Sequence, residues 1–132
     1  MSSVPASEIL VRQEELGRVE VSKHAIMTLV GHAANECYGI VGMAARGLRD
    51  GIAERLNMEN IHRGVVVTLT GEGVAIDLYV IVEYGVRVSE VAQNLMSVVG
   101  YAVERTMGLT VSTVNVNVQG IHGGDRDHGE IF

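Results

Sequence analysis

The feature that most constrains this 132-residue sequence is a stretch of alternating side chains between residues 65 and 84. Apolar side chains recur at every second position on both sides of a turn at Gly71-Glu72-Gly73. They are Val65, Val67 and Leu69 before the turn, and Ile76, Leu78, Val80, Val82 and Tyr84 after it. A period of two is typical of strands that bury one face. Two such runs around a short glycine turn predict a β-hairpin.

Two amphipathic helices are predicted, one on each side of the hairpin. The first begins after Ser22, a residue type that commonly caps helix N-termini, and is expected to end at Gly39. The second is expected to begin at Ser89 and to end at Gly108. Each carries an apolar stripe, so one face of each helix is expected to be buried. The stripes are Ala25, Ile26, Leu29, Val30, Ala33, Ala34 and Cys37, and Val91, Leu95, Val98, Val99, Ala102, Val103 and Thr106.

Shorter patterns predict the remaining elements. Alternation over residues 17–21 and 114–118 predicts one strand near each end of the chain. The glycine-rich stretch 39–51 is expected to be a loop. A short helix is predicted next from three apolar residues four positions apart, Leu48, Ile52 and Leu56.

The element order β-α-(α)-β-β-α-β predicts an α+β fold. Two helices with one apolar face each can cover one side of a sheet. We therefore expect a two-layer sandwich in which two long helices pack on one face of a four-stranded, mainly antiparallel sheet. The order matches the ferredoxin-like pattern with an insertion after the first helix. Residues 15–121 are expected to form this single domain, between a mobile N-terminal arm (1–14) and a mobile polar tail (122–132).

Composition and charge indicate a globular intracellular protein. Hydrophobic residues make up 47% of the chain and charged residues 20%, an ordinary balance for a packed domain. The net charge of −6 weighs against binding to nucleic acid or to an anionic membrane surface. Cys37 is the single cysteine, and the sequence shows neither a signal peptide nor an apolar run of about 20 residues. We expect membrane association only through a partner.

No residue pattern predicts catalysis or a cofactor. The sequence contains no G-x-S-x-G motif and no phosphate-binding loop. Asp77 and Glu83 lie about 20 Å apart along one predicted strand, too far to act as a carboxylate pair. Cys37 lies on the apolar stripe of the first helix, where a buried thiol is expected to be inert. We therefore expect a protein that is not an enzyme.

An amide-rich strand face is the candidate contact surface. Asn115, Asn117 and Gln119 alternate with valines in the last predicted strand, so the three amides share one face. A sheet face that is not covered by helices can be polar and hydrated. The three residues are therefore expected to contact another protein.

The C-terminal tail holds residue types that bind metals. His122, Asp125 and His128 lie among several glycines. Ordering such a tail around an ion costs conformational entropy. A solvated tail without metal is the expectation, and the three residues are only weak metal candidates.

Six blocks of the sequence together resemble one protein family. They are GRVEVS (17–22), YGIVGM (38–43), VAIDLYVIVEYG (74–85), SEVA (89–92), TMGL (106–109) and VNVNVQGI (114–121). In order and spacing they resemble the alkaline shock protein family, which includes the Gls-type general stress proteins and is also called the cell-envelope stress response family. The resemblance covers about residues 15–121. The tail after Ile121, with its His and Asp residues, is not part of the shared pattern.

The resemblance implies a non-enzymatic, cytoplasmic bacterial protein of Gram-positive lineages, linked to envelope or alkaline stress. Some members of the family self-assemble, and some are held at the membrane by a separate anchor protein. The expected partners are therefore further copies of the chain and other proteins, including a membrane-anchored one. The family has no catalytic residues to carry over. The alternative, suggested by the tail histidines and the ferredoxin-like order, is a small-ligand or metal-binding regulatory module.

Overall fold

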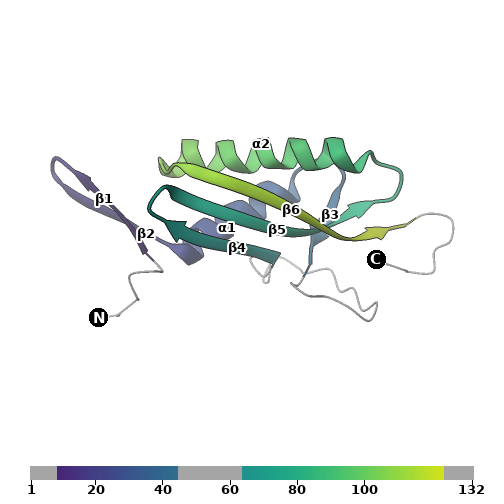
Figure 1. Cartoon of the computed structure of the whole chain (residues 1–132), viewed down its shortest axis with the longest axis horizontal. Helices are drawn as coiled ribbons and strands as arrows, with labels where there is room; N and C mark the ends of the chain where they lie inside the picture. The colour runs from purple at the N-terminus through teal and green to yellow at the C-terminus, as the bar shows by residue number, and fades with distance from the viewer. Residues whose placement is uncertain (1–8, 45–63, 124–132) are drawn as a thin grey trace.

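Strand β5 (Gly73–Glu83) is the centre of the fold in the computed structural model, which describes residues 9–44 and 64–123 (Figure 1). Three other strands pair with it to form the main sheet. The remaining elements are β1 (Ile9–Glu14), β2 (Gly17–Ser22), α1 (Lys23–Asn35), β3 (Ile40–Met43), β4 (Val65–Thr70), α2 (Val88–Met107) and β6 (Val111–His122). The order of strands and helices makes this an α+β fold, as the sequence predicts.

Different strands pair with the two edges of β5. Leu78 pairs with Val65 of β4 and with Val116 of β6, so β4 and β6 lie on opposite edges. β3 pairs antiparallel with the second half of β5, on the same edge as β4. β6 runs parallel to β5, as strands joined by a helical crossover do. The sheet is therefore mainly antiparallel, with one parallel pair.

The predicted hairpin between β4 and β5 is confirmed, although its turn is shorter than expected. Thr70 pairs with Gly73, which leaves only Gly71 and Glu72 in the turn. Gly73 has a φ of 130°, and a Cβ there would collide with the backbone carbonyl of Thr110. Glycine is thus required where β5 begins, both by its conformation and by the close approach of the chain that enters β6.

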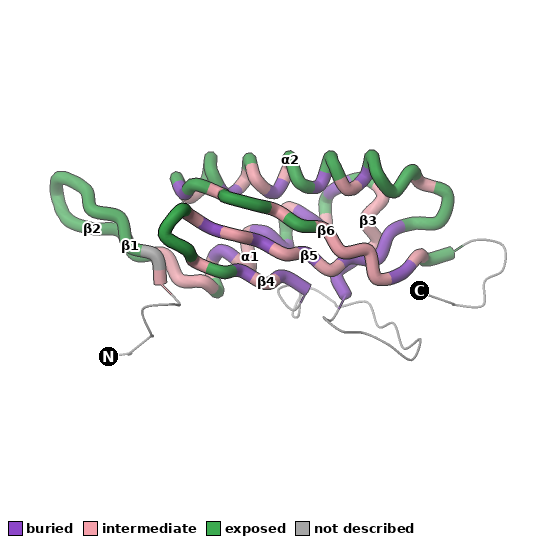
Figure 2. Tube along the Cα trace, in the orientation of Figure 1, coloured by how far each residue is buried: buried purple, intermediate pink, exposed green. Residues whose placement is uncertain are grey.

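One hydrophobic core lies between the main sheet and the two helices (Figure 2). Every second residue of β5 from Val74 to Val82 is fully buried or nearly so. The buried residues that face them are Ile26, Val30 and Ala34 of α1, and Val91, Leu95, Val99 and Val103 of α2. The expected four-stranded sheet with two helices packed on it is confirmed.

The helix ends agree only in part with the predicted caps. Ser22 caps α1, since its Oγ accepts a hydrogen bond from the amide of Ala25 at 3.0 Å. Gly108 ends α2 in the left-handed conformation, as expected. The other two predicted ends are wrong, because α1 stops at Asn35 rather than Gly39, and α2 begins with Arg87 as its N-cap rather than Ser89.

The N-terminal strand predicted at residues 17–21 lies outside the main sheet. It forms β2, which pairs antiparallel with β1 in a separate two-stranded sheet. β1 lies within residues 1–14, where the sequence predicted only an arm. Figure 1 shows this N-terminal hairpin beside the body, beyond the end of α2 where the helix meets β6.

The fourth strand of the main sheet is β3, in a segment predicted to be a loop. Gly39 and Gly42 suggested a loop, but Ile40–Met43 pairs with β5. The pairing register shifts between Ile40 and Gly42, which is a place where a strand tolerates glycine. The short helix predicted from Leu48, Ile52 and Leu56 lies outside the described residues.

Neighbouring residues of α2 provide a test of the core. Leu95 has no exposed surface, whereas the side chain of Met96 is 39% exposed. We expect Leu95→Ala to lower the free energy of unfolding by about 2–5 kcal/mol, because it opens a cavity between the helices and β5. Met96→Ala should cost less than about 1 kcal/mol. Urea denaturation followed by circular dichroism measures both, and equal losses would contradict this placement of the core.

Candidate interaction surfaces

The predicted amide face lies on the side of the sheet opposite the helices, as the alternation requires. Asn115 donates a hydrogen bond from Nδ2 to Asp77 Oδ1 at 2.9 Å, and Asn117 donates one to the carbonyl of Leu78 at 3.1 Å. Gln119 lies where the pairing register shifts between Val118 and Gly120. Two of the three amides therefore hold β6 to β5, which makes this face structural as well as polar.

Of the three metal candidates in the tail, only His122 lies within the described residues. His122 is the exposed last residue of β6, opposite Glu83 of β5. Asp125 and His128 lie outside the described residues. Within residues 9–44 and 64–123, no three His, Cys, Asp or Glu side chains are grouped closely enough to hold a metal ion.

A groove runs along the surface between the end of α1 and the helix α2. One part, with a volume of about 490 Å³, is lined by Cys37, Tyr38, Val98 and Tyr101, among others. A second part of about 520 Å³ continues it toward Arg87 at the start of α2. The two parts share Tyr38 and Asn94. We call the combined depression the helix groove.

Exposed tyrosines border the helix groove. Tyr38 is 78% exposed and Tyr101 is 63% exposed. Arg105 Nη1 donates a hydrogen bond to the Tyr101 hydroxyl at 2.9 Å, and its guanidinium lies 5.9 Å from the centre of that ring. At the other end of the groove, Arg87 forms an ion pair with Glu90 at 3.3 Å. Tyrosine and arginine are enriched in protein–protein interfaces.

Cys37 lies in the floor of the helix groove and is nearly buried. Its thiol donates a hydrogen bond to the Ala33 carbonyl at 3.5 Å. Burial, and to a smaller extent the negative charge of Glu36, raise the pKa of the Cys37 thiol above its ordinary value. The thiol is therefore protonated at neutral pH, which fits the expectation from sequence of an inert, packed cysteine.

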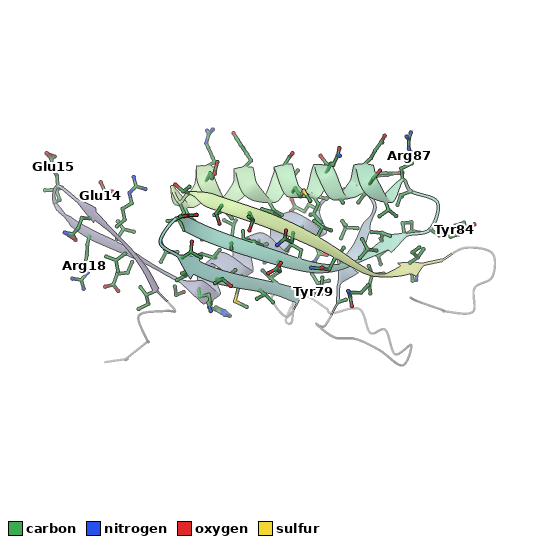
Figure 3. All side chains as sticks on the ribbon, viewed as in Figure 1. Glu14, Glu15, Arg18, Tyr79, Tyr84 and Arg87 are labelled. Carbon is green, nitrogen blue, oxygen red and sulfur yellow. The ribbon has the colours of Figure 1, made fainter. Side chains whose placement is uncertain are left out.

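The N-terminal hairpin is a second surface with exposed apolar side chains. Val11 and Val19 are about half exposed, and Leu16 at the turn is fully exposed. Arg12 connects the hairpin to the body, because its Nη1 donates a hydrogen bond to the Gly108 carbonyl at 2.8 Å. Figure 3 shows Glu15 and Arg18 near the tip of the hairpin, whereas the carboxylate of Glu14 forms an ion pair with Arg12 at 2.8 Å.

Sequence reasoning missed both surfaces. The helix groove joins residues about 60 positions apart, and no local pattern indicates that α1 and α2 meet there. The hairpin was missed because only one of its strands was predicted. The alternation of Arg18, Val19 and Glu20 was the available signal. A strand with this pattern needs a neighbouring strand to form hydrogen bonds with its backbone N–H and C=O groups.

The state of Cys37 predicts its chemical reactivity. A raised pKa means that the reactive thiolate forms at a higher pH than in an accessible cysteine. We expect iodoacetamide to label Cys37 at pH 7 more than about tenfold slower than a cysteine introduced by Met96→Cys in a Cys37→Ala background. Mass spectrometry follows both reactions over a pH series. Equal rates at pH 7 would show that the thiol is neither buried nor perturbed.

Comparison with known proteins supports the family resemblance. Over 106 residues, 80% of this chain and 88% of the relative, the chain is 47% identical to uncharacterized protein YloU of Bacillus subtilis (strain 168). It is 42% identical, over the same shares, to uncharacterized protein Spy1614 of Streptococcus pyogenes serotype M6. No solved structure matches. Residues 11–123 match the model of the alkaline shock protein family, which is described as having a cell envelope-related function. The chain belongs to this family, and the resemblance seen in the sequence is thereby confirmed.

Proposed function

We propose that the protein is a non-enzymatic scaffold or adaptor in an envelope-related stress response, which acts by binding other proteins and further copies of itself. The observation that carries this proposal is the helix groove, with two exposed tyrosines above a partly apolar floor. The family's cell envelope-related function supplies the setting.

The side chains of the helix groove suit a protein segment. Val98 and Ala102 contribute apolar area to its floor, while Tyr38 and Tyr101 add large rings that lose little conformational entropy on binding. Arg105 already holds the Tyr101 ring in place, so part of the surface is ordered before a partner arrives. An exposed groove between two helices is a common receptor for an amphipathic segment.

The same groove also bears on the alternative of a small-ligand module. A volume of about 500 Å³ lies within the range of small-molecule sites, roughly 300–1,000 Å³. Such sites bury most of their ligand, whereas here the bordering Tyr38 and Tyr101 are largely exposed. The exposed border favours a protein segment over a small molecule.

Attachment to the envelope is proposed to run through a partner in the membrane, with the protein itself in the cytoplasm. In the part of the chain that the structure describes, no helix is both long and apolar enough to cross a bilayer. A membrane-anchored protein that presents a short segment to the helix groove is the kind of partner that fits the proposal.

The exposed tyrosines allow a matched test of the groove. We expect Tyr38→Ala with Tyr101→Ala to reduce recovery of cross-linked partners from host cells by about tenfold or more, because tyrosines are frequent binding hot spots. Tyr84→Ala is the control, since Tyr84 is 60% exposed but is not among the groove residues. Affinity purification with quantitative mass spectrometry measures all three proteins. Equal recovery would argue against the groove. A wild-type protein with no partner and no self-association would overturn the proposed function.

A further inference from the structure

The N-terminal hairpin is a two-stranded sheet, so within the described residues the outer edges of both β1 and β2 have no paired strand. β2 pairs with β1 on one side, and within the described ranges no strand pairs with its other side. Residues 17–20 of this strand are exposed. The hairpin extends beyond the body, so neither helix covers it (Figure 1). An exposed edge of this kind is a template for a further strand.

The charged residues on the edge of β2 in one copy are complementary to those on the same edge of a second copy. Arg18 precedes Val19 and Glu20 follows it, and within one chain the two charged side chains form an exposed ion pair at 2.9 Å. If two β2 strands pair antiparallel with Val19 opposite Val19, Arg18 of each copy lies opposite Glu20 of the other. Opposite charges directly across a strand pair stabilise it, and like charges destabilise it. If one strand slides by two residues along the other, Arg18 lies opposite Arg18 or Glu20 lies opposite Glu20, depending on the direction. The charges therefore favour the register with Val19 opposite Val19.

The backbone groups of β2 fit the same register. Glu14 is opposite Gly17 at the two-residue turn of the hairpin. The alternation of an antiparallel pair then directs the N–H and C=O groups of Gly17 and Val19 toward β1, and those of Arg18 and Glu20 toward the free edge. In the register with Val19 at the centre, Arg18 and Glu20 of the two copies are the residues that exchange hydrogen bonds.

Apolar contacts would accompany this pairing. The two Val19 side chains, each 49% exposed in the single chain, meet at the type of position where opposed residues approach most closely. Leu16 of one copy lies opposite Ser22 of the other, at the base of the second hairpin. Leu16 is fully exposed in the single chain and would be partly covered there. The pairing thus buries apolar surface that the single chain leaves in water.

The ends of the two hairpins are also complementary in charge. Glu15 lies at the tip, next to Glu14, whose carboxylate forms an ion pair with Arg12 at 2.8 Å. Antiparallel pairing brings the tip of one copy toward the start of α1 in the other. That helix begins with Lys23 and has no acidic residue in its first turn. Negative charge is favourable near a helix N-terminus, so both ends of the paired hairpins would contribute.

We propose that the free edge of β2 is a homodimer interface, in which two hairpins form one four-stranded antiparallel sheet about a twofold axis at Val19. This proposal rests on the self-association in the proposed function and names the surface responsible for it. The two bodies lie at opposite ends of the joint sheet, because the strands are antiparallel. The helix groove shares no residue with this edge of β2. A strand of a different protein is the competing occupant.

Charge reversal tests the interface in the full chain. We expect Arg18→Glu or Glu20→Arg alone to weaken dimerisation by about tenfold or more, because each change puts two like-charged pairs across the twofold axis. An equimolar mixture of the two variants should regain the wild-type affinity, since the acidic side chains of one chain then face the basic ones of the other. Sedimentation velocity over a concentration series measures the three samples.

A control separates this interface from a general charge effect. Glu83→Arg reverses an exposed charge at the end of β5, at the opposite end of the body from the hairpin (Figure 1) and outside the helix groove, and should leave dimerisation unchanged. Circular dichroism checks that each variant is folded. The proposed interface is contradicted if the wild type dimerises and the hairpin variants have the same dimer affinity, or if their mixture does not regain the wild-type affinity. Self-association through another surface would in that case still agree with the proposed function. The proposed interface is also contradicted if the wild type is monomeric at every concentration, or if the hairpin cross-links only to other proteins.

Discussion

The burial of one face of β5 is the constraint on which the rest of the structure depends. Val74, Ile76, Leu78, Val80 and Val82 are covered by α1 and α2, and the backbone of the same strand holds β3, β4 and β6. A strand buried this fully cannot shift its register by one residue, because every apolar side chain would turn to the opposite face. The positions of both helices and of the two sheet edges follow from this one register.

The core occupies one face of the main sheet, and the two surfaces that we propose for association lie outside it. The N-terminal hairpin extends from the body and is connected through the hydrogen bond from Arg12 to Gly108. The helix groove lies on the outer surface of the two helices. These surfaces use different residues, so the proposed contacts with a second copy and with another protein do not compete for the same side chains. The charged pairs of the hairpin are exposed and add little to its stability. Their arrangement matters more for the choice of partner and register.

The parts of the fold that were predictable are those in which a local pattern matches burial. β4, β5, α2 and β6 show long periodic runs, and the caps Ser22 and Gly108 were read from residue type alone. β1 was missed because its neighbour in the chain, β2, was expected to pair in the main sheet, whereas the two pair with each other. β3 was missed because Gly42 suggested a loop, and only the pairing with β5, far along the chain, identifies this segment as a strand. The amide face of Asn115 and Asn117 was placed correctly by alternation, but its hydrogen bonds to β5 depend on the parallel crossover through α2. The helix groove depends on how the two helices pack, which sequence periodicity does not encode.

Amide hydrogen exchange of the full chain at low and high protein concentration tests most directly the claim that this protein works by association through surfaces outside its core. We expect the amides of Arg18 and Glu20 to exchange more slowly as the concentration rises, while β5 is the slowest region at every concentration and does not change. An exchange rate in the N-terminal hairpin that is the same at all concentrations would contradict it.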